Sequence, residues 1–283
     1  MYQFIQLGII YTLLHISLIS SSLAAPNQAS NKSNQTVLKR VAYIALDPGH
    51  GGRNLGSVNP HDPSTYEKQF TLIIAEHVRT KLLQLGYRVW MSRREDRPFT
   101  LQQRISNAAA AGVDLFVSIH INDATMVGPR GHGTFSLDRF IFDESRLRLH
   151  DFDQQRDGLL LRQAATPPPV DPLIREILLD LLHQDAHHEA AYLATMVNDA
   201  LLQVSPFGTR GVKQANFGVL KGTPAPAIVC EVGFINHPKE GLYVTSKEGM
   251  KELAHGISNG IDQFVKKRIN PSLRSVIEDK LIE

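Results

Sequence analysis

Apolar residues follow two different spacings along the chain, one typical of strands and the other of helices. Short apolar runs predict β-strands at residues 41–46, 87–91, 114–119, 133–137 and 227–232. Apolar residues that recur every three or four positions predict helices at 70–85, at 101–111, around Ala191 and at 250–265. Because strands and helices alternate, we expect an α/β fold, a single domain with a mixed, mostly parallel sheet flanked by helices.

Glycine and capping residues indicate where the predicted helices begin and end. Gly86 and Gly112 each follow the last apolar position of a helix, a place where a left-handed residue commonly stops helices. Thr245 and Glu248 have the spacing of a capping box, which predicts the start of the last helix. The core should close by about Lys267, so residues 269–283 are expected to form a C-terminal tail.

The segment before the penultimate predicted helix breaks the alternation. Residues 140–163 are crowded with Asp, Arg and Leu, and three consecutive prolines at 167–169 fix an extended backbone. Connections of this length in compact domains are usually lids, binding loops or disordered segments. We therefore assign residues 138–182 to an inserted helical or irregular segment.

The amino-terminal residues have the features of a signal peptide. An apolar run at 7–23 ends in Ser22-Leu23-Ala24, which has small residues at the two positions that a signal peptidase reads. We expect residues 1–24 to be removed and 25–39 to be a flexible linker. The first residues contain no Lys or Arg, so an uncleaved membrane anchor is the alternative. No later segment is apolar enough to span a bilayer.

Composition and charge exclude two classes of protein. The 283 residues are 42% hydrophobic and 20% charged, a globular balance sufficient for one core. The formal net charge is only +2, with both signs interspersed, so the electrostatic footprint of a nucleic-acid binder is missing. Cys230 is the only cysteine, which excludes a disulfide framework within the chain.

Three polar residues stand at strand or helix ends and are candidate metal ligands. His50 lies in Asp-Pro-Gly-His-Gly-Gly after the first strand, Glu67 precedes a helix, and His120 ends the strand at 114–119. In α/β proteins this edge of the sheet commonly holds the site. Two imidazoles and a carboxylate suit a catalytic zinc ion with one open position. The alternatives are a turn histidine, a first-turn acid that favours the helix dipole, and a core histidine.

Glu231 is a carboxylate inside an otherwise apolar strand. Burying its charge costs several kcal/mol unless a cation is near, so Glu231 is a candidate general base beside a metal. The alternative is a buried ion pair with Arg93 or Arg104. Cys230 should lie on the opposite strand face, as a small core residue.

A second group of histidines lies on the helix around Ala191. His183 and His187 are four residues apart, and His188 follows. A helical metal pair would need an acidic partner, and none is evident in the pattern. We therefore interpret these three residues as solvated helix surface.

The motifs together resemble the zinc-dependent N-acetylmuramoyl-L-alanine amidases of bacterial cell walls, the amidase_3 family. The resemblance covers residues 41–267 and includes Leu-Asp-Pro-Gly-His-Gly-Gly, Tyr-Glu-Lys, Val-Ser-Ile-His and Pro-Ala-Ile-Val-Cys-Glu-Val-Gly-Phe-Ile. It implies one Zn²⁺ per chain, with His50, Glu67 and His120 as its ligands and Glu231 as the catalytic glutamate. The family cleaves the amide between N-acetylmuramic acid and L-alanine in peptidoglycan.

The resemblance also implies where the protein works and how it is controlled. Residues 40–268 would be the catalytic domain of a periplasmic enzyme of wall remodelling or daughter-cell separation, with secretion or N-terminal anchoring as alternatives. In cell-separating members an inserted helix covers the zinc until an activator protein displaces it. We expect residues 138–182 to be such a lid, with Glu144, Asp157 or Glu176 reaching the metal.

Two further residues and two rival functions follow from the same patterns. Asp47 and Asn122, each close in sequence to a proposed ligand, are candidates for hydrogen bonds that orient the imidazoles. One rival function is a zinc peptidase that cuts within the stem peptide, because it would use a similar metal and base. The other is a catalytically silent wall-binding protein, which would have lost a ligand or Glu231.

Overall fold

The computed structural model describes residues 41–124, 128–138 and 172–268, all within the unit Lys39–Glu283. Its strands are β1 (Tyr43–Pro48), β2 (Arg88–Met91), β3 (Leu115–Asn122), β4 (His132–Leu137), β5 (Thr209–Ala215) and β6 (Ala227–Phe234). Its helices are α2 (Glu67–Gln84), α3 (Leu101–Ala111), α6 (Pro172–Leu202), α7 (Glu240–Thr245), α8 (Lys247–Arg268) and the short 3-10 helix η2 (Gly218–Leu220).

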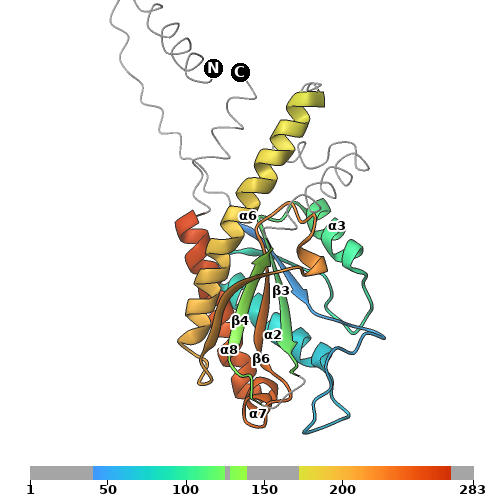
Figure 1. The fold of residues 1–283 in the computed structure, drawn as a ribbon, viewed down its shortest axis with the longest axis vertical. Helices are drawn as coiled ribbons and strands as arrows, with labels where there is room; N and C mark the ends of the chain where they lie inside the picture. The colour runs from blue at the N-terminus through green and yellow to red at the C-terminus, as the bar shows by residue number, and fades with distance from the viewer. Residues whose placement is uncertain (1–40, 125–127, 139–171, 269–283) are drawn as a thin grey trace, which may run out of the picture. The chain divides into compact units, whose positions relative to one another are not determined.

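The described strands form one six-stranded sheet in the order β2-β1-β3-β6-β4-β5. The first four strands in this order are parallel to each other, and β4 is antiparallel to β6 and parallel to β5. Helices cover both faces of the sheet (Figure 1). The predicted class, an α/β domain with a mixed, mostly parallel sheet, is confirmed.

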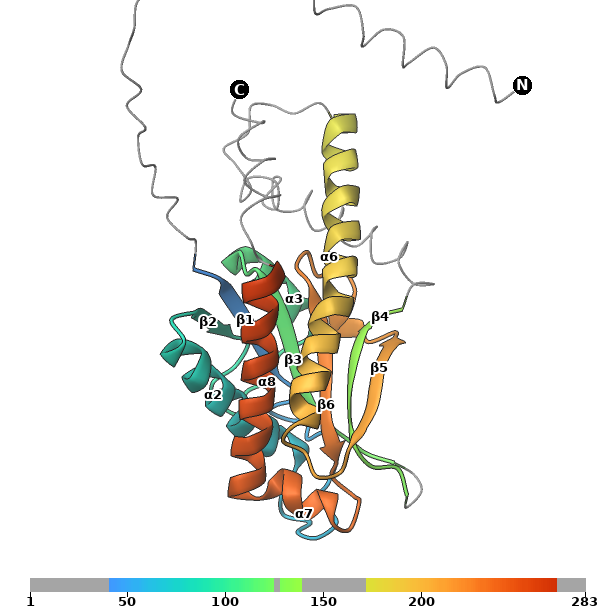
Figure 2. The same cartoon turned by 90° about the vertical axis from the view of Figure 1, so that its left-hand side faces the viewer.

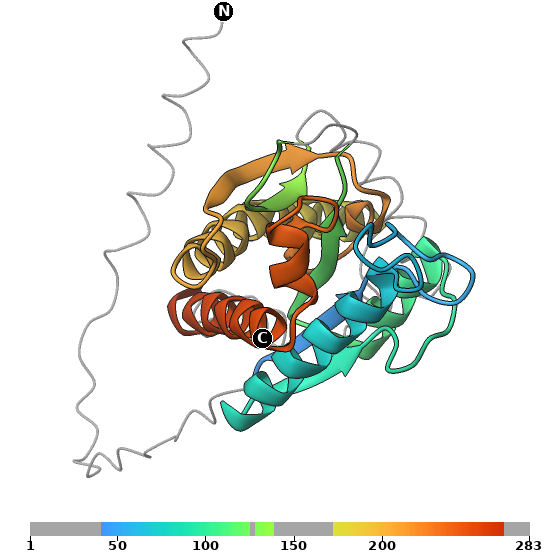
Figure 3. The ribbon, with the colours of Figure 1, turned by 90° about the horizontal axis from the view of Figure 1, so that it is seen from below.

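The larger core lies between the sheet and the helices α2, α6 and α8. Apolar residues of β1, β3 and β6 that point to one face, such as Ile119 and Cys230, pack there against helix residues such as Leu193 and Ile257. Figure 3 shows α6 between the β4–β5 pair and α8. Gly260 of α8 allows this packing, because a Cβ there would lie 2.5 Å from the Cα of Val197 in α6.

A smaller core lies on the opposite face, beneath α3 and η2. Phe116 of β3 and Val229 of β6 pack there with Ala108, Val219 and Leu220. Side chains alternate between the two faces along each strand. Asp47, His120 and Glu231 therefore lie on the face of the smaller core, because their neighbours in sequence contribute to the larger one.

The amino-terminal turns of α6 project beyond the sheet (Figures 1 and 2). Several apolar side chains there are at least half exposed: Leu173, Ile174, Ile177 and Leu181. Residues 172–182, which we assigned to the insert, form one continuous helix with 183–202. Residues 139–171 of the expected insert lie outside the described residues, as do the expected signal peptide, linker and C-terminal tail. Within the described chain, no helix is long and apolar enough to cross a membrane.

The structure corrects some predicted boundaries. Helix α2 begins at Glu67 itself, not after it. The last helix is capped by Ser246, whose side chain accepts a hydrogen bond from the Gly249 amide at 2.9 Å. Thr245 is the last residue of α7, and its hydroxyl donates to the Gly241 carbonyl at 2.7 Å. The capping box predicted at Thr245 and Glu248 is therefore wrong.

Candidate metal centre

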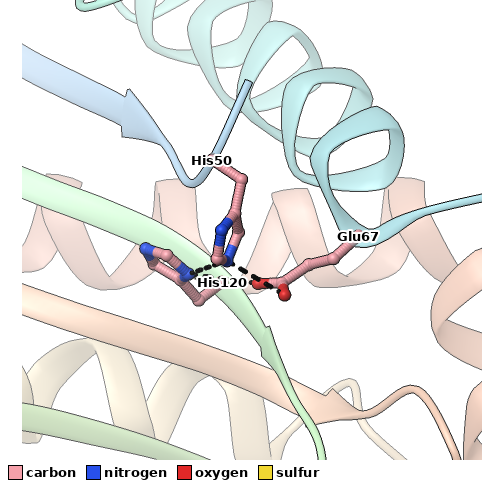
Figure 4. Close-up of side chains that lie close together, drawn as sticks. All are labelled: His50, Glu67 and His120. Atoms are coloured by element: carbon pink, nitrogen blue, oxygen red, sulfur yellow. Dashed lines mark hydrogen bonds and ion pairs between the residues drawn. The ribbon is translucent and has the colours of Figure 1, made fainter. Parts of the chain in front are cut away.

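Three candidate ligands from three different elements meet at one end of the sheet (Figure 4). His50 lies on the loop after β1, Glu67 is the first residue of α2, and His120 lies near the end of β3. The strands β1 and β3 are parallel neighbours, so their carboxyl ends lie at the same edge. One ligand atom from each of the three residues lies within 4.8 Å of the others.

The separations of the ligand atoms fit a small tetrahedral cation. His50 Nε2 lies 3.0 Å from Glu67 Oε2, and His120 Nδ1 lies 3.1 Å from Glu67 Oε1. The two imidazole nitrogens, His50 Nε2 and His120 Nδ1, are 3.1 Å apart. Ligands bound tetrahedrally at about 2.0–2.1 Å stand roughly 3.3 Å from one another. The donor set, two imidazoles and a carboxylate, can therefore hold a metal ion with little rearrangement.

The loop that carries His50 has an unusual backbone. His50 has φ of 61°, and it is the only non-glycine residue with positive φ in the described chain. Such a conformation costs about 1–3 kcal/mol and persists only where surrounding contacts enforce it. Gly49 is required beside it, because a Cβ there would lie 2.3 Å from Cε1 of His120.

Two buried arginines hold this loop by its carbonyl groups. Arg104 donates to the Pro48 carbonyl at 2.9 Å and to the His50 carbonyl at 2.5 Å. Arg93 donates to the Pro48 carbonyl at 3.1 Å and to the Gly49 carbonyl at 2.8 Å. These hydrogen bonds fix three successive peptide units and so determine where the His50 imidazole points.

Asp47 anchors the arginine clamp. Its carboxylate pairs with Arg104 Nη1 at 2.5 Å and accepts hydrogen bonds from the hydroxyls of Ser92 at 2.5 Å and Ser118 at 2.8 Å. Asp47 is 1% exposed and Arg104 4% exposed. A buried ion pair is tolerable here because both groups have several hydrogen-bond partners.

Asn54 and two backbone amides orient the ligands. Asn54 Oδ1 lies 2.8 Å from His50 Nδ1, which leaves Nε2 toward the centre. Glu67 Oε1 accepts from the Ile121 amide at 3.0 Å, and Oε2 accepts from the Ser57 amide at 2.9 Å. Asn54 was missed by sequence reasoning, although an amide four residues after a candidate ligand in a glycine-rich loop was the available signal.

The prediction that Asp47 and Asn122 orient the imidazoles is wrong. Among the described contacts Asp47 binds Arg104 and two serines, and Asn122 accepts a hydrogen bond from the adjacent Asp123 amide at 2.8 Å. Asp47 acts on His50 only indirectly, through Arg104. The short distance in sequence between Asp47 and His50 does not reveal whether Asp47 contacts the imidazole itself or supports the loop that carries it.

The charges of the three ligands are coupled. Burial opposes the ionisation of Glu67, but the hydrogen bonds and charges of His120 and His50 hold its pKa well below the usual range. Burial alone would lower the pKa of His120, whereas its hydrogen bond to Glu67 and the charges of Glu231 and Glu67 raise it. The centre therefore favours a positive charge between the carboxylate and the imidazoles. A metal ion supplies that charge when bound, and a proton supplies it otherwise.

Glu231 lies beside the three ligands and is not one of them. In the sheet register it is the partner of His120 on the neighbouring strand β6. Its Oε2 atom is buried and has no hydrogen-bond partner among the described residues. Burial, opposed by the charge of His120 and reinforced by that of Glu67, raises the pKa of Glu231 to about 7. A carboxyl group with such a pKa can accept and return a proton near neutral pH.

The alternative that Glu231 forms a buried ion pair with Arg93 or Arg104 is wrong. Both arginines are engaged by the loop after β1, and Arg104 has Asp47 as its carboxylate partner. Cys230 is fully buried on the opposite strand face, as predicted, and burial raises the pKa of its thiol. The thiol is therefore a core group and not a ligand of this centre.

The remaining sequence candidates do not join the centre. His183 is 3% exposed, so the expectation of solvated surface is wrong for that residue, because α6 packs this side against the domain. His187 is half-buried and His188 is exposed. Glu176 is exposed in the amino-terminal turns of α6, and the group of potential metal ligands found in the described chain does not include it. Glu144 and Asp157 lie outside the described residues.

Comparisons with known proteins agree with the geometry. The family model Amidase_3, described as N-acetylmuramoyl-L-alanine amidase, matches residues 44–263. The chain is 28% identical over 226 residues to the N-acetylmuramoyl-L-alanine amidase AmiC of Neisseria meningitidis serogroup B, covering 80% of this chain and 53% of that protein. It is 28% identical over 233 residues to AmiA of Escherichia coli K12, covering 82% and 78%. The chain thus spans about half the length of the Neisseria relative.

Solved structures show the same fold. An N-acetylmuramoyl-L-alanine amidase from Clostridium difficile 630 superposes with a TM-score of 0.62 at 23% identity, covering 81% of this chain and 98% of that one. AmiC2 of Nostoc punctiforme gives a TM-score of 0.59 at 22% identity, covering 80% and 98%. Because the matching family model extends over most of the chain and contains all four candidate residues, the protein belongs to the Amidase_3 family of N-acetylmuramoyl-L-alanine amidases.

Proposed function

We propose that the protein hydrolyses the amide between N-acetylmuramic acid and the L-alanine of the peptidoglycan stem peptide. In this proposal one Zn²⁺ is held by His50, Glu67 and His120, and Glu231 is the general base and acid. The observation that carries the proposal is the position of Glu231, a half-buried carboxylate opposite His120 with a raised pKa and a buried, unpartnered Oε2 atom. Family membership identifies the amide.

The metal, Glu231 and the residues that orient the ligands have separate roles in the proposed reaction. When bound, zinc supplies Lewis acidity that polarises a carbonyl and lowers the pKa of water toward about 7. Glu231 accepts a proton from the attacking water and delivers it to the nitrogen of L-alanine as the carbon–nitrogen bond breaks. Asn54 and the backbone amides of Ser57 and Ile121 keep the ligands oriented. The products are a free lactyl carboxylate and a free L-alanine amino group.

The cellular setting belongs to the same proposal. Residues 1–24 direct export, residues 40–268 form the catalytic domain, and the enzyme acts in the periplasm on wall remodelling or cell separation. Similarity to proteins named AmiA and AmiC supports this setting. Residues 138–182 regulate access to the metal and respond to an activator protein. Deleting residues 138–166 should raise wall hydrolysis, and unchanged or lost activity in a folded, zinc-loaded deletion would contradict the lid.

Metal analysis combined with product analysis tests the proposed chemistry. Glu231→Gln should retain about one zinc per chain and lose turnover by roughly 10²–10⁴-fold, the usual contribution of a positioned proton-transfer group. His50→Ala should lose zinc and activity together. Glu95→Gln is the matched control, because Glu95 is a surface carboxylate whose side chain is 72% exposed.

Mass spectrometry of fragments from purified wall identifies the bond. The amidase proposal requires free lactyl carboxyl groups on the glycan and intact L-alanine amino termini on the peptides. A cut within the stem peptide would support the zinc peptidase. A zinc-loaded wild type without any cleavage, tested both before and after deletion of residues 138–166, would support the silent wall-binding protein.

A further inference from the structure

A cavity of about 410 Å³ opens beside the metal centre on the face of the smaller core. Its walls come from the loop after β1, the start of α3, the η2 segment and strands β3 and β6. His50 and His120 belong to its lining, so a molecule in the cavity touches the reacting centre. We call it the Phe217 pocket, after the aromatic side chain on the η2 side.

The walls of the Phe217 pocket are mostly apolar and aromatic. Phe99 and Leu101 line the α3 side, and Phe217 and Val219 line the η2 side. The two sides approach closely at Gly218, where a Cβ would lie 2.7 Å from Cδ1 of Leu101. Leu101 remains 53% exposed despite this close approach. Exposed apolar groups around a concave site are typical of ligand recognition.

The pocket contains no free charge among its lining residues apart from the metal ligands. Arg104 is neutralised by Asp47 at 2.5 Å and is 4% exposed. The other polar lining groups, Asn54 and Thr100, are uncharged. Such a lining suits a ring with apolar faces and uncharged polar groups at its edge, and away from the metal ligands it offers no free cation to a carboxylate.

The electrostatic character of the surroundings changes along β6. Val229 lines the pocket, Glu231 follows it on the same strand face, and Phe234 lies at the strand end. The exposed guanidinium of Arg210 lies 5.3 Å from the centre of the Phe234 ring. Arg210 also lies beside Gly133, the strand partner of Glu231, since its Cβ is 3.7 Å from a Cβ built on that glycine. The order along the strand is therefore apolar pocket, catalytic carboxylate, exposed cation.

The two halves of the substrate differ in the same way. On the acyl side of the scissile amide stands N-acetylmuramic acid, whose only acid is consumed in that amide, so the sugar is uncharged. On the amine side, L-alanine is followed by a residue with a free carboxylate, D-glutamate. An uncharged half and an anionic half must extend in different directions from the metal.

We infer that the Phe217 pocket binds the N-acetylmuramyl ring, with its apolar faces against Phe217 and Phe99, and that the stem peptide leaves toward Arg210. This inference rests on the proposed amidase function and assigns the direction in which the substrate lies across the centre. Phe217, Phe99 and Leu101 are then determinants of specificity for the sugar.

Inhibition by the two separate products of the reaction tests the assignment. The inhibition constants of free N-acetylmuramic acid and of the dipeptide L-alanyl-γ-D-glutamate are measured with the zinc-loaded full chain. Phe217→Leu should raise the constant for the sugar by between about twofold and tenfold, the usual worth of one aromatic contact. The constant for the dipeptide should change less than twofold. Arg210→Gln should show the opposite pattern.

Phe135→Leu is the matched control for altered packing. Its ring lies edge-on to Phe217 with centroids 5.3 Å apart, but it is not part of the pocket lining. Phe99→Leu provides a second test on the opposite wall if Phe217→Leu does not fold. Thermal unfolding of each variant confirms that the folded protein is compared.

The outcomes separate this inference from the proposed function. If both aromatic variants weaken the dipeptide more than the sugar, weaken both equally, or weaken neither, the assignment of the pocket is overturned while the amidase remains. If zinc-loaded wild type releases no L-alanine amino termini from wall, the proposed function itself fails.

Discussion

The arginine clamp predicts that a residue with no contact to the metal determines metal affinity. Replacing Arg104 by Met removes the partner of Asp47 and the donors to the Pro48 and His50 carbonyls. The buried Asp47 carboxylate would keep only its two serine hydroxyls. We expect lower stability, and we expect weaker metal binding because His50 is held in a left-handed conformation.

The structure sets the expected magnitudes. Breaking a buried ion pair by removing one partner costs about 3–5 kcal/mol, because the other charge remains buried. Displacing the support of a metal ligand typically weakens metal binding about 10–100-fold, equivalent to roughly 1.4–2.7 kcal/mol. Arg104→Lys should retain the charge but lose the planar fork that reaches two carbonyls at once, and should fall between wild type and Arg104→Met.

Urea unfolding of the metal-free protein and zinc competition with a chelator measure the two effects. Arg94→Met is the matched control, since Arg94 forms a surface pair with Glu76 at 3.0 Å and its side chain is 62% exposed. Such a pair is worth about 0–1 kcal/mol. Adding Asp47→Asn to Arg104→Met should recover part of the stability, because the unpaired charge is removed, without restoring zinc affinity.

Wild-type zinc affinity in a folded Arg104→Met variant would refute the clamp. It would show that the His50 loop adopts its conformation without the guanidinium. A loss of zinc affinity that the double variant fully recovers would also contradict the reasoning, because it would place the effect in the charge of Asp47 and not in the carbonyl contacts.

Three further predictions follow from the fold. Burial raises the pKa of Glu240 to about 7, against 4.5 for a free glutamate, despite its hydrogen bond from the Gly131 amide at 3.0 Å. Ionising Glu240 in the folded protein destabilises the fold, and this cost is absent below about pH 4.5 and complete above about pH 7. The free energy of unfolding of wild type should therefore fall by up to about 3 kcal/mol relative to Glu240→Gln as the pH rises through that window, measured by denaturant titration. Gly260→Ala should destabilise the protein by about 1–3 kcal/mol in urea unfolding, because the added Cβ would collide with Val197. This cost should exceed the gain from the higher helix propensity of Ala. A neutral or stabilising change would show that α6 can shift. Zinc at 100 times its dissociation constant should stabilise the fold by about 2.7 kcal/mol in thermal scans, and Glu67→Ala should abolish that shift.

Much of the fold is predictable because local signals and burial coincide. The pattern predicts α3 correctly at both ends, since Thr100 caps it and Gly112 stops it in a left-handed conformation with φ of 67°. Strand β5 is absent from the prediction because it is an edge strand with mostly exposed residues and no apolar alternation. Helix α7 has six residues, too few for a helical period to appear.

The site also contains residues that local motifs predict and residues that they do not. His50, Glu67, His120 and Glu231 stand in recognisable motifs at element ends, and the structure brings all four together. The residues that support these four depend on tertiary packing instead of on local motifs. Arg104 reaches Asp47 across 57 positions, and that contact depends on how α3 packs against the sheet. No local pattern distinguishes it from an alternative pairing of Arg104 with Glu231.

The pairing of His120 with Glu231 across β3 and β6 makes the centre intolerant of changes in strand length. A slip of one residue in either strand would turn one of the two side chains to the opposite face, into the larger core. Insertions and deletions that preserve activity must therefore fall in the connections between the central strands. Related enzymes should differ in loop length while their strands keep a constant number of residues before each of these two positions.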